Sequence, residues 1–393
     1  MMGSMAGRRL GKMLCIAAIS FLLGACGGTT SSGNPAAMLY AASTGDNTLV
    51  AFPLNDNGTL GTPIGTYSTG GYPQSVAADP SNRYLFSANQ GSSTLSSFAI
   101  EDNGALRKIG DYGTGTGSTP MAVVVHPLGN FVYAVSEGTE QVRGFRLDNG
   151  TLVSVTQAAT GSLPAEATFD PNGQYLYVSN SDLYNPSLSA FTVNSANGTL
   201  QPISGYPKSF SSLSNPKGLA VAKRPGGNFL YAANEYSGPP SELSCFRINA
   251  NGTLTQLTPV PILPSVPLNT RPDALRVDPA NRLLFVLSEG LGFIAAYNIG
   301  DGGTLTAALK DPVNPNSNTY YEPQGELLNP EWAVVDPNGK YLYVVDSKAD
   351  IPGSGLGDVY AYSINTDNTI TYLGNAGGTP LANPFSAVVI RRQ

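Results

Sequence analysis

The stretch PAEATFDPNGQYLYVSN (164–180) and its copy PEWAVVDPNGKYLYVVD (330–346) decide the fold of this chain. Each begins with a proline and a short, mostly apolar run, turns at Asp-Pro-Asn-Gly, and returns as a second run that starts with Tyr-Leu-Tyr. Two β-rich runs joined by such turn residues are typical of an antiparallel hairpin. The chain therefore repeats one hairpin.

The same pattern recurs seven times along the chain. A third run and an Asn-Gly hairpin follow the second one, as in LSAFTVNSANGTL (188–200) and LSCFRINANGTL (243–254). Each repeat then reads as four short strands, and the repeats are 44 to 58 residues long. The first strands begin at Pro73, Pro120, Pro164, Pro216, Pro272, Pro330 and Pro384.

Four antiparallel strands at this period predict a β-propeller blade, because one blade cannot bury both of its faces alone. Seven repeats predict an all-β fold with seven blades, which occupies residues 38–393 as one domain. The C-terminal run PFSAVVI (384–390) supplies the innermost strand of a blade whose other three strands come from residues 38–66. We therefore expect the ring to close by joining the C-terminal strand to the N-terminal strands.

The composition agrees with a turn-rich β fold and excludes several classes of protein. The 393 residues include 45 Gly and 30 Pro, and only 12% are charged, which is too few for a coiled coil or a helical bundle. The net charge of −6 would repel phosphates, so we expect no nucleic-acid partner. The single histidine, His126, replaces Asp in an Asp-Pro turn, where we interpret it as a turn residue. We expect no cofactor.

The N-terminal segment has the pattern of an export signal. Arg8, Arg9 and Lys12 precede the apolar run Met13–Leu23, and Leu-Gly-Ala-Cys then ends at Cys26. This ending resembles the bacterial lipoprotein box, which implies that Cys26 is lipidated. An ordinary secretory signal and a twin-arginine signal are the alternatives.

These features predict a signal peptide at 1–25, a flexible Gly- and Ser-rich tether at 26–37, and a mature protein anchored to a membrane of the bacterial cell envelope. Removing residues 1–25 takes three cations from 21 and no anions from 27, which leaves a net charge of −9. Cys245 then remains as the only other cysteine, and we interpret it as a buried strand residue.

The lengths of the connections distinguish the two faces of the predicted ring. The Asp-Pro turns join strands one and two, and the Asn-Gly hairpins join strands three and four. Both are short and uniform, and because they alternate with the other two connections they lie together on one face, which we call the turn face. The connections on the opposite face, the loop face, vary in length and include 235–242, 258–272, 310–330 and 346–358. Variable loops on a rigid scaffold commonly bind ligands, so we expect a small molecule or an envelope protein to bind there.

The blade motifs PNGQYLYVSN and PNGKYLYVVD, with the paired Asn-Gly hairpins, resemble those of the seven-bladed lactonase-like propellers. This family includes 6-phosphogluconolactonase and muconate-cyclising enzymes. The resemblance implies His, Glu and Arg side chains at the channel mouth of enzymatic members. Glu166 matches an acidic position of one such motif and is our candidate catalytic residue, whereas Ser181 stands where the motif would have an arginine.

The residues that open the inner strands should converge at the loop-face end of the channel. In the later repeats several of these residues are charged, and they lie beside the only tryptophan and the longest loops. Such a mixture of apolar and polar residues is typical of small-molecule sites. The candidate ligand-binding residues are Lys217, Glu235, Arg271, Asp273, Glu289, Glu331, Trp332 and Asp346.

A metal site is not indicated, because the spacing of Asp346, Asp350 and Asp358 does not fit a calcium-binding loop. Three functions follow from the sequence. The first is a tethered propeller that binds a small molecule or an envelope partner. The alternatives are a lactone hydrolase at the channel mouth and an assembly scaffold for envelope proteins.

Overall fold

The computed structural model describes residues 34–235, 242–258, 260–261, 271–289, 292–308, 320–321, 327, 329–348, 356–376 and 381–391. Residues 34–393 form one compact unit. The predicted signal peptide and Cys26 lie outside the described residues, as do large parts of the variable loops. Within the described part of the chain, no helix is long and apolar enough to cross a membrane.

The described strands form seven antiparallel sheets, which are the blades of a seven-bladed propeller. The first three complete blades lie near the start of the chain. From the centre outward they are β4 (Pro73–Ala78), β5 (Tyr84–Asn89), β6 (Thr94–Ile100) and β7 (Leu106–Gly113); β8 (Pro120–Val125), β9 (Phe131–Ser136), β10 (Gln141–Asp148) and β11 (Thr151–Ala159); and β12 (Pro164–Phe169), β13 (Tyr175–Asn180), β14 (Ser187–Val193) and β15 (Leu200–Pro202).

The next three blades have the same order and carry a short additional strand on the third strand. They are β16 (Pro216–Arg224), β17 (Gly227–Asn234), β18 (Glu242–Ile248) and β19 (Leu254–Gln256), with β20 (Val260–Pro261); β21 (Pro272–Val277), β22 (Leu283–Ser288), β23 (Phe293–Ile299) and β24 (Leu305–Ala307), with β25 (Tyr320–Tyr321); and β26 (Pro330–Val335), β27 (Tyr341–Asp346), β28 (Leu356–Ile364) and β29 (Ile370–Asn375), with β30 (Leu381–Ala382).

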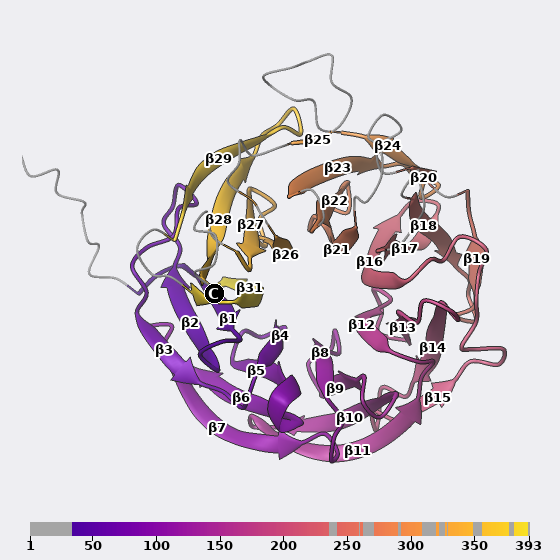
Figure 1. The fold of residues 1–393 in the computed structure, drawn as a ribbon, viewed down its shortest axis with the longest axis horizontal. Coiled ribbons are helices and arrows are strands. Elements are labelled where there is room, and N and C mark those ends of the chain that lie inside the picture. Colours follow the sequence, from indigo (N-terminus) through magenta and orange to yellow (C-terminus); the bar gives the residue numbers. More distant parts are fainter. Residues whose placement is uncertain are drawn as a thin grey trace, which may run out of the picture. The chain divides into compact units, whose positions relative to one another are not determined.

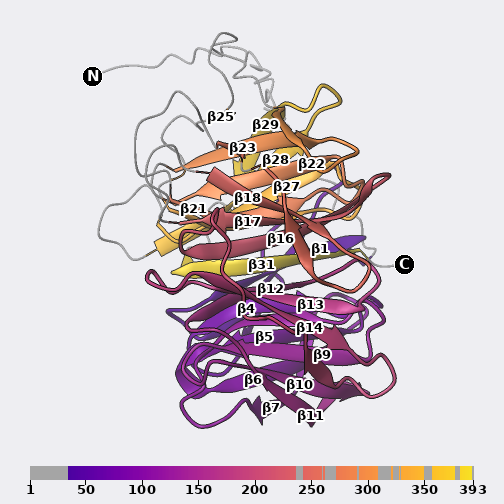
Figure 2. The same cartoon turned by 90° about the vertical axis from the view of Figure 1, so that its right-hand side faces the viewer.

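The seventh blade combines the two ends of the propeller and confirms the predicted closure. Its order is β31 (Pro384–Arg391), β1 (Ala37–Ser43), β2 (Thr48–Pro53) and β3 (Gly65–Ser68). β31 pairs antiparallel with β1. Figure 1 shows β31 among the other inner strands around the centre, and Figure 2 shows the strands running across the thickness of the ring.

The Asp-Pro turns are stabilised by their own aspartates. In each of four turns the Asp Oδ1 atom accepts a hydrogen bond from the backbone N–H five residues later, at the start of the second strand. These carboxylates are buried, and each accepts a backbone hydrogen bond within its turn. The residues are Asp79, Asp170, Asp278 and Asp336.

Tyrosine hydroxyls connect neighbouring blades. The buried tyrosine of the second strand donates to the carbonyl of a glycine in the next blade's hairpin, as from Tyr133 to Gly198 at 2.8 Å. Five blades share this bond, and it explains why the chain is rich in tyrosine and hairpin glycine. The donors are Tyr40, Tyr133, Tyr177, Tyr231 and Tyr343.

Phenylalanine takes this position in the other two blades, at Phe86 and Phe285. In the blade of Phe86, the Ser97 hydroxyl makes the equivalent contact with the Gly150 carbonyl at 2.6 Å. Apolar side chains fill the space between blades, and each buried cluster draws residues from two adjacent sheets. Cys245 lies in one such cluster. The stacked blades thus hold the inner strands in fixed positions around the channel.

Candidate functional site

A bulge follows the first proline of the six complete inner strands, for example between Pro216 and Leu219. The residue after each proline leaves the ladder, and these residues meet at the loop-face end of the channel. With Phe385 they surround a cavity of about 60 Å³, which we call the mouth cavity. The ring consists of Gln74, Met121, Ala165, Lys217, Asp273, Glu331 and Phe385.

Lys217 and Asp273 form an ion pair within this ring. The Lys217 Nζ atom lies 2.7 Å from Asp273 Oδ1. Burial lowers the pKa of Lys217, but the charges of Asp273 and Glu235 outweigh it, so the pKa lies above its ordinary value. Burial raises the pKa of Asp273, and Lys217 opposes this effect. The charges of Lys217 and Asp273 therefore largely neutralise one another.

Glu331 is held by neighbouring polar groups. Its Oε1 atom accepts hydrogen bonds from Asn329 Nδ2 at 2.5 Å and from the Ser347 hydroxyl at 3.0 Å. Burial, followed by the charges of Asp273 and Glu289, raises the pKa of Glu331 to about 7. The charge of Glu331 consequently changes near neutral pH.

Arg271 joins two glutamates beside the mouth. Its Nη2 atom lies 2.7 Å from Glu235 Oε1 and 3.0 Å from Glu289 Oε2. Glu235 also accepts a hydrogen bond from Asn215 Nδ2 at 2.8 Å. None of these three charged residues lines the mouth cavity.

Asp346 has a local structural role. It is completely buried and accepts hydrogen bonds from the backbone N–H groups of Asn329 and Lys348. It lies opposite Asp358 in the ladder between β27 and β28. Asp350 is outside the described residues, and the described residues contain no group of three or more metal-ligating side chains.

Glu166 lies one layer deeper than the mouth ring and pairs with Arg276. The Arg276 Nη1 atom is 3.1 Å from Glu166 Oε1, although the two residues come from β12 and β21, with β16 between them. Glu166 Oε2 accepts from the Leu219 N–H of β16 at 3.0 Å. The pair therefore spans three inner strands.

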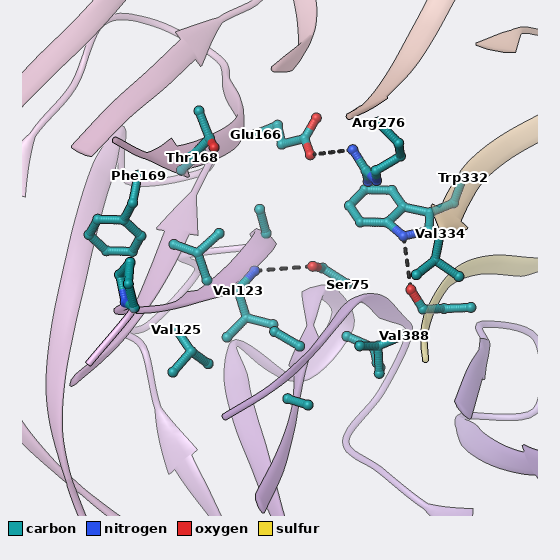
Figure 3. Close-up of a pocket in the computed structure, with 18 of the residues that line it drawn as sticks. Ser75, Val123, Val125, Glu166, Thr168, Phe169, Arg276, Trp332, Val334 and Val388 are labelled. Carbon is teal, nitrogen blue, oxygen red and sulfur yellow. Dashed lines mark hydrogen bonds and ion pairs between the residues drawn. The ribbon is translucent and has the colours of Figure 1, made fainter. Parts of the chain in front are cut away.

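Trp332 of β26 supports the arginine from the other side. The Arg276 guanidinium carbon lies 3.5 Å from the centre of the Trp332 ring, which is a cation–π contact. The indole Nε1–H donates to the Ala387 carbonyl of β31 at 2.9 Å. Figure 3 shows Arg276 between Glu166 and Trp332. The stack fixes the guanidinium plane within the channel.

The electrostatics of this pair are those of a buried acid and base. Burial raises the pKa of Glu166, and the charge of Arg276 opposes the rise. Burial lowers the pKa of Arg276, which Glu166 opposes. Arg276 Nη2 is covered from solvent and has no hydrogen-bond partner among the described residues. The pair thus offers one carboxylate and one unused cationic N–H group.

A larger cavity of about 470 Å³ lies on the turn-face side of the pair, and we call it the chamber. Its floor includes Glu166, Arg276 and Trp332, and its far end reaches the turn residues Pro127, Asp170 and Pro171. Its walls are mostly aliphatic inner-strand side chains, including Ala77, Val124, Val334 and Val388. Figure 3 shows Val334 and Val388 among them. The structure therefore places the larger space on the face opposite the variable loops.

Arg276 is the site residue that sequence analysis missed. The expected arginine position holds Ser181, and the arginine that pairs with Glu166 comes from β21 instead. A signal for it was present, since Arg276 occupies the fifth position of an inner strand where the other repeats have Ala77, Val124, Thr168, Ala220, Val334 and Val388. A lone cation at that position indicates a channel-facing polar group.

His126 lies in its turn. It is buried, its Nε2 atom is 2.9 Å from the Gly173 carbonyl, and its Nδ1 atom accepts from the Leu128 N–H at 3.1 Å. The histidine thus bridges two turns of adjacent blades.

A family profile described as "Lactonase, 7-bladed beta-propeller" matches residues 33–125 and 115–316. No curated protein matches the chain in sequence.

Solved structures share the fold at low identity. A putative 6-phosphogluconolactonase from Bacteroides fragilis aligns with a TM-score of 0.70 and 17% identity over 92% of this chain and 99% of its own. One from Bacteroides uniformis gives 0.71 and 19%, over 91% and 100%. A periplasmic gluconolactonase from Pseudomonas aeruginosa gives 0.69 and 16%, over 90% and 99%. At these identities the likeness shows the fold alone.

Proposed function

The chain belongs to the seven-bladed lactonase β-propeller family, and on that premise we propose that it hydrolyses a lactone at the Glu166–Arg276 pair. One observation carries the proposal: a buried carboxylate and a guanidinium with an unused N–H group meet at the floor of the chamber. Ester hydrolysis needs a base for water and a donor for the developing oxyanion. These two side chains supply both.

In the proposed reaction Arg276 turns slightly so that Nη2 donates to the lactone carbonyl oxygen. Glu166 takes a proton from water, and the water oxygen forms a bond to the carbonyl carbon while the carbonyl π electrons move to oxygen. When the carbonyl re-forms, the ring C–O bond breaks and the leaving oxygen takes the proton from Glu166. The product is the hydroxy acid, and Glu166 returns to the carboxylate. Because Glu166 acts ionised, activity should rise with pH through its raised pKa.

The mouth cluster supports a binding function less well. Lys217, Arg271 and Glu331 already have partners within the protein. An envelope partner on the loop face would contact loops that are largely outside the described residues. We therefore place hydrolysis before ligand binding at the mouth and before a scaffold role.

The test is hydrolysis of simple lactones by the purified protein and its variants. We expect Glu166→Gln and Arg276→Met each to reduce kcat/KM at least about 100-fold. Arg224→Met is the matched control, because Arg224 forms a 2.8 Å ion pair with Asp301 and lines neither cavity. Wild-type rates in folded Glu166→Gln and Arg276→Met proteins would rule out this site.

We also propose that the protein is exported and tethered to an envelope membrane by a lipid on Cys26. The basic start, the apolar run and the Leu-Gly-Ala-Cys ending support this location. The fold is shared with a periplasmic gluconolactonase, which is consistent with export. Cys26→Ser should leave the protein soluble or unprocessed after a carbonate wash of membranes, whereas retention of the variant in the membrane would contradict lipid tethering.

A further inference from the structure

The walls of the chamber bear on which lactone the Glu166–Arg276 pair would accept. Inner-strand residues with aliphatic side chains dominate the walls, including Val124 of β8, Val334 of β26 and Val388 of β31. All three are only partly buried, which leaves part of each side chain accessible. A ligand in the chamber would therefore contact hydrocarbon along most of its length.

The chamber has almost no free charge. Among its lining residues, the charged ones are Glu166, Arg276 and Asp170. Glu166 and Arg276 neutralise one another. The Asp170 carboxylate is buried in its turn and accepts from the Tyr175 and Asn172 N–H groups at 2.7 and 3.1 Å. A phosphate or carboxylate on a substrate would find no second cation among these residues.

The loop-face end is no better for an anionic substrate. Lys217 pairs there with Asp273, and Arg271 pairs with Glu235 and Glu289. Glu331 adds a fourth carboxyl group. Among the described residues of this cluster the carboxylates thus outnumber the cations, and their field repels a phosphorylated ligand. The mouth cavity of about 60 Å³ is also too small for a substituted ring, whereas the 470 Å³ chamber falls in the usual range of ligand sites.

We infer that the substrate is an uncharged lactone with an apolar alkyl or aryl substituent, bound from the turn face, and that phosphorylated sugar lactones are rejected. The inference rests on the proposed lactone hydrolysis. The carbonyl lies against Arg276 at the floor, and the substituent extends along the chamber walls. Specificity then comes from buried hydrocarbon, with Arg276 as the one cationic contact.

The first experiment measures kcat/KM for γ-lactones that carry no substituent, ethyl, propyl or pentyl, beside glucono-1,5-lactone and its 6-phosphate. We expect a rise of about threefold to fourfold per methylene until the chamber is full. A higher kcat/KM for the phosphorylated lactone than for the pentyl lactone would overturn the inference and leave the hydrolase proposal standing.

Variants locate the substituent. Val124→Phe and Val388→Phe, from two different blades, fill part of the chamber and should abolish the rise in kcat/KM with chain length. Met121→Phe is the matched control, because it adds the same ring to the same strand as Val124→Phe but on the mouth side of the pair. An unchanged preference in both chamber variants, with wild-type melting temperatures, would overturn the assignment.

Binding of non-hydrolysable γ-lactams with the same substituents separates the two proposals. Trp332 is the only tryptophan and lines both cavities, so its fluorescence reports occupancy. If lactams bind more tightly with chain length but no lactone is opened, the hydrolase proposal fails and the ligand class stands. If lactam affinity is independent of chain length, the ligand class is wrong.

Discussion

The two ends of the channel differ in the number of their charges and in the size of the cavity beside them. At the loop face, Lys217 pairs with Asp273, and Arg271 pairs with Glu235 and Glu289. At the floor of the chamber, a single ion pair borders an apolar cavity, and one guanidinium N–H group has no partner among the described residues. A dense group of charges can therefore surround only a small cavity, whereas a single ion pair at the floor of a large apolar cavity leaves room for a ligand.

The largest effect should come from removing the strand that both ends share. Deleting residues 384–393 removes β31, which pairs with β1 and whose Ala387 carbonyl holds Trp332. The exposed edge of β1 and the lost wall should unfold the ring or lower its melting temperature by more than about 10 °C. Circular dichroism melting checks this, and a reversible transition near the wild-type temperature would contradict closure through β31.

The second prediction concerns the pair at the chamber floor. Arg276→Met leaves the buried Glu166 carboxylate without its cation, so the free energy of unfolding at pH 8 should fall by about 3–5 kcal/mol. Adding Glu166→Gln to Arg276→Met should recover much of this loss, because no charge is then left buried. Urea unfolding measures both, and an additive double variant would show that the two side chains do not interact.

The third prediction concerns the pH dependence of stability that Glu331 contributes at the mouth. Because the folded-state pKa of Glu331 is raised to about 7, the unfolded chain ionises first, and stability falls as pH rises from about 4.5 to 7. Glu331→Gln keeps the hydrogen-bonding shape and should remove on the order of 1–3 kcal/mol of that decline. Urea unfolding at pH 5 and pH 8 measures it. An equal decline in wild type and variant would assign the pH dependence to another group.

The smallest effect should appear at the half-exposed ion pairs beside the mouth. Arg271→Met removes two contacts to Glu235 and Glu289, yet its side chain is 34% exposed, so solvent screens the loss. We expect about 1 kcal/mol of destabilisation, which should shrink further at 1 M salt. A loss as large as that of Arg276→Met would remove the distinction between the two ends.

The fold could be predicted because each blade repeats the same local sequence signals. Proline starts the inner strand, aspartate closes the turn, and Asn-Gly forms the outer hairpin, so seven copies specify seven blades and their closure. The short strands β20, β25 and β30 were not predicted. They consist of two residues each within long Pro- or Gly-containing loops, where no alternation of apolar residues identifies a strand.

The site was only partly predictable for a physical reason. The convergence of the mouth ring follows from strand register alone, which a repeat makes visible. The contact between Glu166 and Arg276 joins residues 110 positions apart and depends on how blades rotate around the channel. The sequence also could not reveal that Asp346 accepts hydrogen bonds from backbone N–H groups. The residues at the same position of the other repeats have other roles.

The pairing of β1 with β31 also has a consequence for biosynthesis. The Ser43 hydroxyl donates to the Ala382 carbonyl, 339 positions later in the chain. Strand β1, which is synthesised first, therefore cannot complete its sheet until β31 has been synthesised. Until β31 arrives, a chain that is still being synthesised or translocated presents an open strand edge to any chaperone or neighbouring chain. Nascent chains truncated before residue 384 should accordingly be captured by strand-binding chaperones, and those extending beyond it should be released.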